Sequence, residues 1–219
     1  MNFIKAKAIA VTQPVVDFIP DSEGIISYSA RVSNPDNQTN FETANKLLSY
    51  CAKHGHWSVF ETASVVMEVQ VPRDIARQLL RHRSFSFQEF SQRYSQAQEF
   101  VIRDARMQDY KNRQNSIESV PEDTSSWWYN EQSSLLAKIE EVYQEALEKG
   151  IAKECARVIL PEGNTMSYLY MNGTVRSYMH YCQLRRHEAT QKEHRILADE
   201  IAKQMAEYFP SLAEHFEAN

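Results

Sequence analysis

The chain has 219 residues, 42% of them hydrophobic and 11% aromatic, which is enough to bury the core of one domain. Its 29 acidic residues outnumber 24 lysines and arginines, and the formal net charge of −5 argues against a protein that coats a nucleic-acid backbone. Three widely spaced cysteines, Cys51, Cys155 and Cys182, form no Cys-x-x-Cys pair, which argues against a disulfide framework and a structural zinc site. We therefore expect a single domain over residues 1–219 in a reducing compartment, with a small ligand rather than nucleic acid as partner.

No stretch of the sequence reaches the roughly 18 consecutive apolar residues that suggest a membrane span. Residues 1–7 also lack the apolar run of a signal peptide. The sequence thus predicts a soluble, cytoplasmic protein with no membrane partner. The five glycines are too scattered to form a Gly-x-Gly-x-x-Gly turn or a Walker-type loop, so a bound nucleotide needs another kind of site.

The first predicted elements alternate between strand and helix. Small and branched apolar residues alternate over 5–13, which predicts a strand, and apolar residues at helical spacing predict a helix over 39–54 that ends at Gly55. Alternating apolar residues then predict a half-buried strand over 59–71. Pro72 ends that strand and suits the first position of a helix.

Three arginines lie four residues apart on that next helix: Arg73, Arg77 and Arg81. They are predicted to share one face, where like charges repel by about a few tenths of a kcal/mol each unless acids or a bound anion compensate. Taken alone, Arg73 and Arg77 are typical of surface arginines that pair with Asp74 or Glu68.

The second half of the chain is predominantly helical in pattern. Residues 103–134 are polar and mixed in charge, and we expect them to form a peripheral excursion. Four helical segments follow, namely a long amphipathic helix over 135–147 ended by Gly150, a short piece carrying Arg157 that stops at Pro161, a helix from about 173 to 186, and a last one over 196–209. Long helices outnumber strands, so the expected fold class is α+β, a single domain with a sheet and several long helices.

The run from Arg81 to Tyr94 is the strongest signal of a site. It holds three arginines, one histidine, one carboxylate and three serines, and it contains no lysine. Guanidinium groups offer a flat fork of donors that grips phosphate or carboxylate oxygens in pairs, whereas lysine is a mobile point charge. The composition of the run therefore favours oriented binding of a small anion.

The same run resembles the signature of flavin-dependent thymidylate synthases, which is Arg81-His82-Arg83, seven further residues and then Ser91. Other blocks resemble that family in the family's order: Ala30-Arg31-Val32-Ser33, Lys53-His54-Gly55-His56, Phe60-Glu61, Ala76-Arg77-Gln78, Ala156-Arg157-Val158-Ile159-Leu160-Pro161 and Leu184-Arg185. Together they span most of the chain outside 103–134, which makes the resemblance far more specific than one short motif.

This resemblance implies an enzyme that reductively methylates dUMP to dTMP. Methylene-tetrahydrofolate would donate the carbon, bound FAD would carry the hydride, and NADPH would be the reductant. It also implies the family's α+β fold and a homotetramer whose active sites draw on several subunits.

The family's functional residues carry over by position. The resemblance places around dUMP the residues Gln78, Arg81, Glu89, Phe90, Ser91, Gln92, Arg93, Arg157 and Arg185. It assigns to FAD the residues Ser58, Arg81, His82, Arg83, Ser84, Glu89, Thr174, Arg176 and His180, with His56 near the flavin ring. It assigns no metal.

These roles are consistent with the chemistry of the side chains. A dianionic 5′-phosphate needs several donors, and Arg93, Arg157 and the Ser91 hydroxyl supply charge and geometry together. Attack on C6 of uracil builds negative charge on the ring oxygens and N3, so Arg185, the family's uracil-activating residue, would stabilise the transition state more than the ground state.

The sequence departs from the family pattern in two places. Gln88 stands where the family usually has Asn. One extra residue between Arg157 and Arg185 leaves both Thr174 and Asn172 as candidates for the flavin contact. A further group could border the folate or flavin site and consists of His187, Gln191, Glu193 and His194.

Other interpretations of the same residues remain open. A nucleic-acid-binding protein could use the arginines of 73–93 with stacking aromatics, although the acidic total argues against it. Zinc binding by His54, His56 and Glu61 is geometrically possible but lacks an open-site motif. The other thymidylate synthase family uses a cysteine that follows a proline, and none of the three cysteines has that context.

Overall fold

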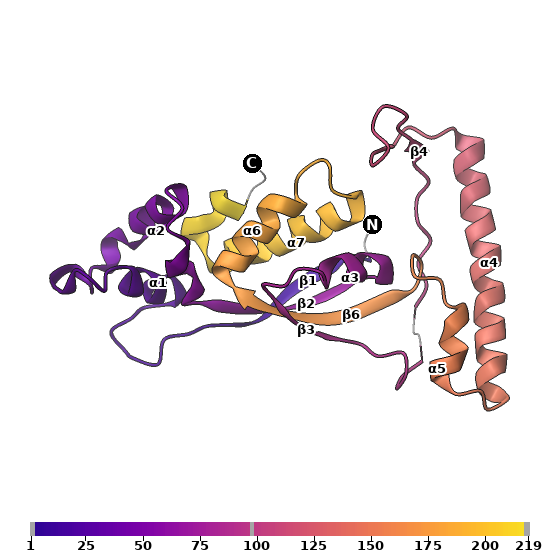
Figure 1. Ribbon diagram of the computed structural model, residues 1–219, viewed down its shortest axis with the longest axis horizontal. Coiled ribbons are helices and arrows are strands. Elements are labelled where there is room, and N and C mark those ends of the chain that lie inside the picture. Colours follow the sequence, from indigo (N-terminus) through magenta and orange to yellow (C-terminus); the bar gives the residue numbers. More distant parts are fainter. Residues whose placement is uncertain (1–2, 97–98, 217–219) are drawn as a thin grey trace. The chain divides into compact units, whose positions relative to one another are not determined.

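A computed structural model describes residues 3–96 and 99–216 and combines helices with a four-stranded sheet in the order β1-β2-β6-β3 (Figure 1). The strands of this sheet are β1 (Lys5–Val11), β2 (Ser64–Pro72), β3 (Ser86–Glu89) and β6 (Met166–Thr174). A second, two-stranded sheet pairs β4 (Met107–Gln108) antiparallel with β5 (Ser116–Ile117). This mixture of helix and sheet confirms the predicted α+β class.

Helices make up most of the remaining regular structure. The α-helices are α1 (Ser22–Ala30), α2 (Ala44–Lys53), α3 (Arg73–Leu79), α4 (Glu122–Glu148), α5 (Lys153–Ala156), α6 (Val175–Arg185) and α7 (Lys192–Tyr208). The 3-10 helices are η1 (Pro35–Asn37), η2 (Phe41–Thr43), η3 (Trp57–Glu61), η4 (Arg157–Ile159) and η5 (Pro210–Phe216). None of the helices in the described ranges is long and apolar enough to cross a membrane.

The chain divides into two compact units that interleave in sequence. Unit 1 comprises Met1–Val69, Leu80–Gln88 and Leu169–Asn219, and unit 2 comprises Gln70–Leu79 and Glu89–Tyr168. The residues of the Arg81–Tyr94 run are therefore shared between the units, with Arg81 to Gln88 in unit 1 and Glu89 to Tyr94 in unit 2.

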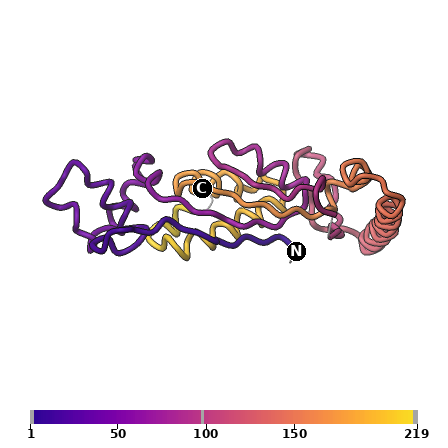
Figure 2. Tube along the Cα trace, turned by 90° about the horizontal axis from the view of Figure 1, so that it is seen from below, coloured from indigo at the N-terminus to yellow at the C-terminus, as the bar shows by residue number. Residues whose placement is uncertain are grey.

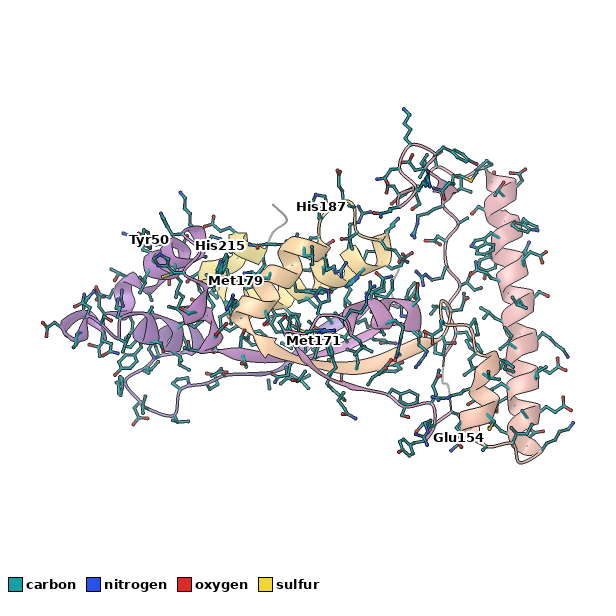
Figure 3. The ribbon with its side chains drawn as sticks, viewed as in Figure 1. Tyr50, Glu154, Met171, Met179, His187 and His215 are labelled. Carbon is teal, nitrogen blue, oxygen red and sulfur yellow. The ribbon has the colours of Figure 1, made fainter. Side chains whose placement is uncertain are left out.

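The core of unit 1 forms where α7 packs against β1 and α6, with the α7 tube lying along the indigo β1 strand in Figure 2. The predicted apolar stripe of the last helix is confirmed, because Leu197, Ile201 and Met205 are fully buried. Met171 on β6 and Met179 on α6 are buried as well, and both are labelled in Figure 3. Burial of these side chains supplies the hydrophobic stabilisation of the unit.

The N-terminal elements largely follow the sequence pattern. The strand expected over 5–13 is β1, and the helix expected over 39–54 is α2 preceded by the short η2 turn. Gly55 follows α2 with a φ of 71°, a left-handed conformation that favours glycine and ends the helix.

The strand expected over 59–71 is wrong at its start. Residues 57–61 form η3, and β2 begins only at Ser64. Within β2 the predicted alternation is confirmed, since Val65, Met67, Val69 and Val71 are buried while Glu68 is exposed. The buried Phe60 anchors η3, so tertiary burial overrides the strand propensity of its neighbours.

The helix predicted after Pro72 is confirmed but is shorter than its arginine spacing suggests. It ends at Leu79, so Arg81 does not continue the face of Arg73 and Arg77. The chain turns instead so that Phe85 enters the core of unit 1, where its ring lies 4.9 Å from that of Tyr178. Burial of this aromatic ring favours the turn over another helical turn.

Unit 2 contains the 27-residue helix α4, which begins much earlier than predicted. Its first turn lies at Glu122 and Asp123, where acidic side chains favour a helix N-terminus, so the second part of the 103–134 excursion is helical. Leu136 and Tyr143 form its buried side, and Gly150 after its end has a φ of 81°, which confirms the predicted helix end.

The strand β6 is absent from the sequence-based expectations. Its residues alternate, with Leu169, Met171 and Gly173 buried and Tyr168 and Tyr170 exposed. That is the period-two pattern of a half-buried strand. The predicted helix from about 173 accordingly begins at Val175, with Thr174 as its N-cap residue.

Candidate functional site

The first part of the candidate site is the turn from Arg81 to Ser84 in unit 1. It is fixed by Phe85, whose ring packs so closely on Gly173 of β6 that a Cβ there would lie 2.3 Å from the ring. Any residue larger than glycine at 173 would therefore displace the ring. The turn is also tied to α6, because Ser177 Oγ donates a hydrogen bond to the Ser84 carbonyl oxygen at 3.2 Å.

One hydrogen bond joins this turn to the predicted uracil-activating residue. Arg185 Nε, in the last turn of α6, donates to His82 Nε2 at 2.9 Å. Because Nε2 accepts this bond, the His82 ring must be neutral and carry its proton on Nδ1. The structure thus brings His82 and Arg185 together within unit 1, as two residues that the resemblance assigns to different ligands.

Electrostatics around His82 agree with a neutral ring. Burial, with the cationic Arg185 and Arg81, lowers the pKa of His82 from 6.5 to about 4. Burial also lowers the pKa of the Arg185 guanidinium, although a guanidinium remains charged at neutral pH. Two positive charges therefore lie around an uncharged imidazole.

Arg81 and Arg83 are the free donors of this region. Both are exposed, and neither guanidinium makes a hydrogen bond or ion pair with another residue of 3–96 and 99–216. Ser84 is exposed beside them. Uncompensated guanidinium groups beside a hydroxyl form a donor set that fits an anionic phosphate group.

The other residues assigned to the flavin lie in unit 1 with distinct partners. Thr174 caps α6, since its Oγ1 accepts a hydrogen bond from Ser177 N at 3.3 Å. Arg176 forms an ion pair with Glu61. The His180 ring lies 4.6 Å from that of Trp57, edge to face. Burial, and to a smaller extent the positive charge of Arg176, lowers the pKa of His180.

His56 and Ser58 complete the flavin set, and both are exposed. His56 lies beside Tyr50 of α2, with ring centroids 5.9 Å apart, and the Tyr50 ring also stacks on His54 at 4.0 Å. Ser58 belongs to η3. No group of three His, Cys, Asp or Glu side chains in the described part of the chain is placed to hold a metal ion.

The second part of the candidate site lies in unit 2 and is built around Glu89. Its carboxylate accepts from Ser167 Oγ at 2.8 Å and pairs with Arg77 and, at 3.7 Å, with Arg73. The side chains of Arg73 and Glu89 are only 12% and 17% exposed, so this cluster is mostly shielded from water. Together with Glu162, which pairs with Arg73 at 3.4 Å, Glu89 compensates the charge of the two α3 arginines.

The predicted partners of Arg73 were wrong, because Glu89 and Glu162 take the place of Asp74 and Glu68. Asp74 pairs instead with Arg103 at 3.1 Å. Sequence spacing along one helix could not reveal these partners, since Glu89 and Glu162 come from distant segments.

Arg93 is held beside the segment that carries Arg157. Its guanidinium pairs with Glu154 of α5 at 3.2 Å, three residues before Arg157, and Glu154 is labelled in Figure 3. Both partners are more than half exposed, at 56% and 54%, so water screens this pair and it contributes little to stability. Ser91 Oγ lies 3.4 Å from the Arg93 backbone N–H.

Arg157 is the uncompensated arginine of this part. It is half-buried on η4 and makes no hydrogen bond or ion pair with the residues the structure describes. The predicted phosphate donors thus all lie in unit 2, namely Arg93, Ser91 and Arg157. Glu154, which positions Arg93, carried no sequence signal beyond its place before Arg157.

The remaining nucleotide residues of unit 2 differ in exposure. Phe90 is half-buried, and its backbone N–H donates to the Tyr168 carbonyl oxygen at 2.8 Å. Gln92 is buried, with no partner for its Nε2 among the described residues. Gln78 is half-buried on α3. Of the dUMP set, Arg81 and Arg185 belong to unit 1 and the others to unit 2.

The two buried cysteines, Cys51 and Cys182, show no sign of activation. All three are free, and burial raises the pKa of Cys51 and raises that of Cys182 to about 12. A thiol with a raised pKa is a poor nucleophile at neutral pH because the thiolate is the reactive form.

Comparisons with known proteins cover most of the chain. The model of the family described as thymidylate synthase complementing protein matches residues 14–211. A probable flavin-dependent thymidylate synthase of Paramecium bursaria Chlorella virus 1 is 53% identical over 211 residues, 96% of this chain and 97% of the viral protein. The flavin-dependent thymidylate synthase of Synechocystis sp. is 51% identical over 208 residues, 94% of this chain and 95% of that protein.

Solved structures show the same similarity. The UMP/dUMP methylase PolB from Streptomyces cacaoi bound with 5-Br dUMP is 26% identical, with a TM-score of 0.79 over 97% of this chain and 94% of that one. The same enzyme bound with 5-Br UMP gives a TM-score of 0.81 at 26% identity, over 97% and 93% of the two chains.

Proposed function

Because the chain belongs to the family of thymidylate synthase complementing proteins and is a flavin-dependent thymidylate synthase, we propose that it methylates dUMP to dTMP. Methylene-tetrahydrofolate is the proposed carbon donor, FAD the flavin and NADPH the reductant. The observation that carries the proposal is the turn in which His82 accepts a hydrogen bond from Arg185, while the guanidinium groups of Arg81 and Arg83 have no partner within residues 3–96 and 99–216.

The donor set of this turn fits FAD. The pyrophosphate of FAD is anionic, and Arg81, Arg83 and Ser84 present exposed donors that no carboxylate of the described chain occupies. When bound, the flavin supplies the hydride chemistry that no side chain offers. Thr174, Arg176, His180, His56 and Ser58 are proposed as further contacts, with Arg176 exchanging its Glu61 partner for the cofactor.

The proposed dUMP site binds the phosphate with Arg93, Arg157 and the Ser91 hydroxyl. The exposed Arg93–Glu154 pair keeps the guanidinium ordered until phosphate replaces the carboxylate. Gln78, Phe90 and Gln92 are proposed to contact the nucleoside. Glu89, assigned by resemblance to both ligands, has a second role here, because it braces Arg73 and Arg77 of α3.

Arg185 is proposed to act on the uracil ring. Its guanidinium, held at Nε by His82, leaves both terminal nitrogens as donors toward the ring oxygens and N3, where negative charge develops. A fixed donor at that point stabilises the transition state more than the ground state and therefore raises the rate of the chemical step. No cysteine is assigned a covalent role, in keeping with the buried thiols of Cys51 and Cys182.

A homotetramer with shared active sites is the proposed assembly. The exposed side of α4 carries apolar residues one heptad apart, Trp128, Leu135 and Val142, which suits a helix contact with a second copy. Sharing of sites also means that the nucleotide residues of units 1 and 2 can come from different chains. The free cysteines support a reducing, cytoplasmic location.

The test of this function is reconstitution of the full chain with FAD. The protein should show flavin absorption, oxidise NADPH faster when dUMP is added, and form dTMP detectable by mass spectrometry when methylene-tetrahydrofolate is present. A folded protein that does not bind flavin, or a flavin-loaded one that forms no dTMP, would overturn the proposal.

A further inference from the structure

A buried cluster of rings lies behind Arg185 and is not used by the chemistry described above. It consists of Tyr181 on α6 and His194 on α7, which pack against His82. Tyr181 is 1% exposed and His194 is fully buried. Both helices belong to unit 1, so the cluster lies within a single compact unit.

The three rings contact one another edge to face or tilted. The His82 ring lies 5.1 Å from Tyr181 and 6.2 Å from His194, at interplanar angles of 76° and 89°. Tyr181 and His194 lie 5.8 Å apart at 46°. Aromatic rings at these separations make specific contacts, so the cluster restricts the orientation of the His82 ring.

The charges around the cluster also restrict His82. The charged groups that act on it are Arg185 from α6 and Arg81 from its own turn, and both are cations. The titratable neighbours Tyr181 and His194 are buried, which lowers the pKa of His194 to about 3 and raises that of Tyr181. A neutral His82 can therefore accept from Arg185, whereas a protonated ring would lose the acceptor and repel the guanidinium.

We propose that His82 is a positioning residue for Arg185, and that the buried rings of Tyr181 and His194 hold His82 in the orientation that accepts the Arg185 Nε–H. The consequence for the enzyme, that the guanidinium is pre-set for uracil, rests on the proposed function. The orientation itself does not, because it is a property of the protein alone.

The Tyr181 hydroxyl gives the cluster a built-in control. It is buried and has no hydrogen-bond partner among the described residues. Its ring therefore acts by packing, and Tyr181→Phe should leave Arg185 in place without loss of stability, since an unpaired buried hydroxyl is removed. Tyr181→Leu removes the ring and should loosen His82.

The test observes Arg185 directly in the full chain without ligands. With nitrogen-15 in arginine only, the Arg185 Nε–H signal is identified by its loss in Arg185→Lys. In the unmodified protein and in Tyr181→Phe, this proton should exchange slowly with water. It should exchange at least about tenfold faster in His82→Leu, which has no acceptor, than in His82→Gln, whose side-chain oxygen can accept. Tyr181→Leu and His194→Leu should resemble His82→Leu.

Equal exchange in His82→Leu and His82→Gln would overturn the proposal, and so would slow exchange in folded Tyr181→Leu. If Tyr181→Leu does not fold, Tyr181→Met preserves an apolar side chain of similar length and takes its place. Turnover provides the second readout, in which His82→Gln should recover a kcat at least about tenfold above that of His82→Leu at saturating dUMP. Absence of dTMP formation in every variant and in the unmodified protein would sink the proposed function, while the exchange data would still decide the role of His82.

Discussion

The arginines of the 81–84 turn in unit 1 and those of α3 in unit 2 differ in what compensates their charge. In unit 2, Arg73 and Arg77 on α3 share Glu89, and Arg103 pairs with Asp74. In the turn of unit 1, Arg81 and Arg83 have no acidic partner among the described residues. Guanidinium groups of the first kind brace the fold, whereas those of the second kind are available to a ligand anion.

The number of arginines in a segment alone therefore does not define a ligand site. All these residues fall within 73–103, and their spacing gives no sign of which carry a carboxylate partner. Arg93 is intermediate, because its pair with Glu154 is more than half exposed, whereas the pair of Arg73 with Glu89 is mostly buried. Exposure of the ion pair therefore separates arginines that can exchange partners from those that cannot.

The largest effect is predicted for Arg185→Ala. Loss of a donor that acts where charge develops should lower kcat for dTMP formation on the order of a hundredfold or more. Arg113→Ala, at an exposed arginine of unit 2, is the matched control and should stay near the native rate. Steady-state kinetics at saturating dUMP provide the measurement, and near-native turnover in folded Arg185→Ala would refute the role.

The two arginines of the turn are predicted to have the next largest effect. Arg81→Ala and Arg83→Ala should each weaken FAD binding by about tenfold or more, because each removes a charge-assisted contact. Their thermal stability without flavin should hardly change, since neither guanidinium has a hydrogen-bond or ion-pair partner among the described residues. Flavin titration followed by fluorescence measures the first quantity and thermal unfolding the second.

Arg77→Ala is the counterpart in unit 2. It should leave FAD affinity unchanged and lower the free energy of unfolding by less than about 1 kcal/mol, because the Arg77 side chain is 44% exposed and its pair with Glu89 is partly screened. If Arg77→Ala instead lost flavin as readily as Arg81→Ala, the distinction between bracing and ligand-binding arginines would fail.

The half-buried His82 and the buried His194 predict a dependence of stability on pH. The pKa of His82 falls from 6.5 to about 4 and that of His194 from 6.5 to about 3, with burial the main cause. Below pH 6.5 the unfolded chain therefore binds more protons than the folded chain. The contribution of these histidines to the free energy of unfolding is fully present above pH 6.5 and is lost as the pH falls toward 4. The slope is about 1.4 kcal/mol per pH unit for each histidine.

Urea unfolding between pH 7.5 and 5 measures this slope. His194→Leu removes one titrating group, so its free energy of unfolding should fall less steeply below pH 6.5 than that of the unmodified chain. Parallel profiles for the two proteins would show that His194 is not held neutral in the folded state.

The smallest effect on catalysis is predicted for the cysteines. A variant with Cys51→Ala, Cys155→Ala and Cys182→Ala should retain kcat within about twofold, although the two buried sites should cost about 1 kcal/mol each in stability. Ser91→Ala should weaken dUMP binding without abolishing turnover. A folded, flavin-loaded triple variant with no dTMP formation would require enzyme-linked catalysis.

The sequence predicted the α+β class, the family and most helices, because helical periodicity and the Arg81-His82-Arg83 motif are local signals. It missed β6, although Leu169 and Met171 alternate with exposed tyrosines, and it placed Arg81 on the α3 face. It also missed the bond from Arg185 to His82 and the pair of Arg93 with Glu154. Such pairs depend on long-range packing, which spacing along one segment does not encode.

A crystal structure of the full chain with FAD and dUMP would show directly which arginines bind the ligands and which brace the fold. We predict that the phosphate groups contact Arg81, Arg83, Arg93 and Arg157, that Arg185 contacts the uracil, and that the cluster of Glu89 with Arg73 and Arg77 remains intact. Phosphate groups bound to Arg73 or Arg77 in place of Glu89, with Arg81 and Arg83 left in solvent, would refute this division of roles among the arginines.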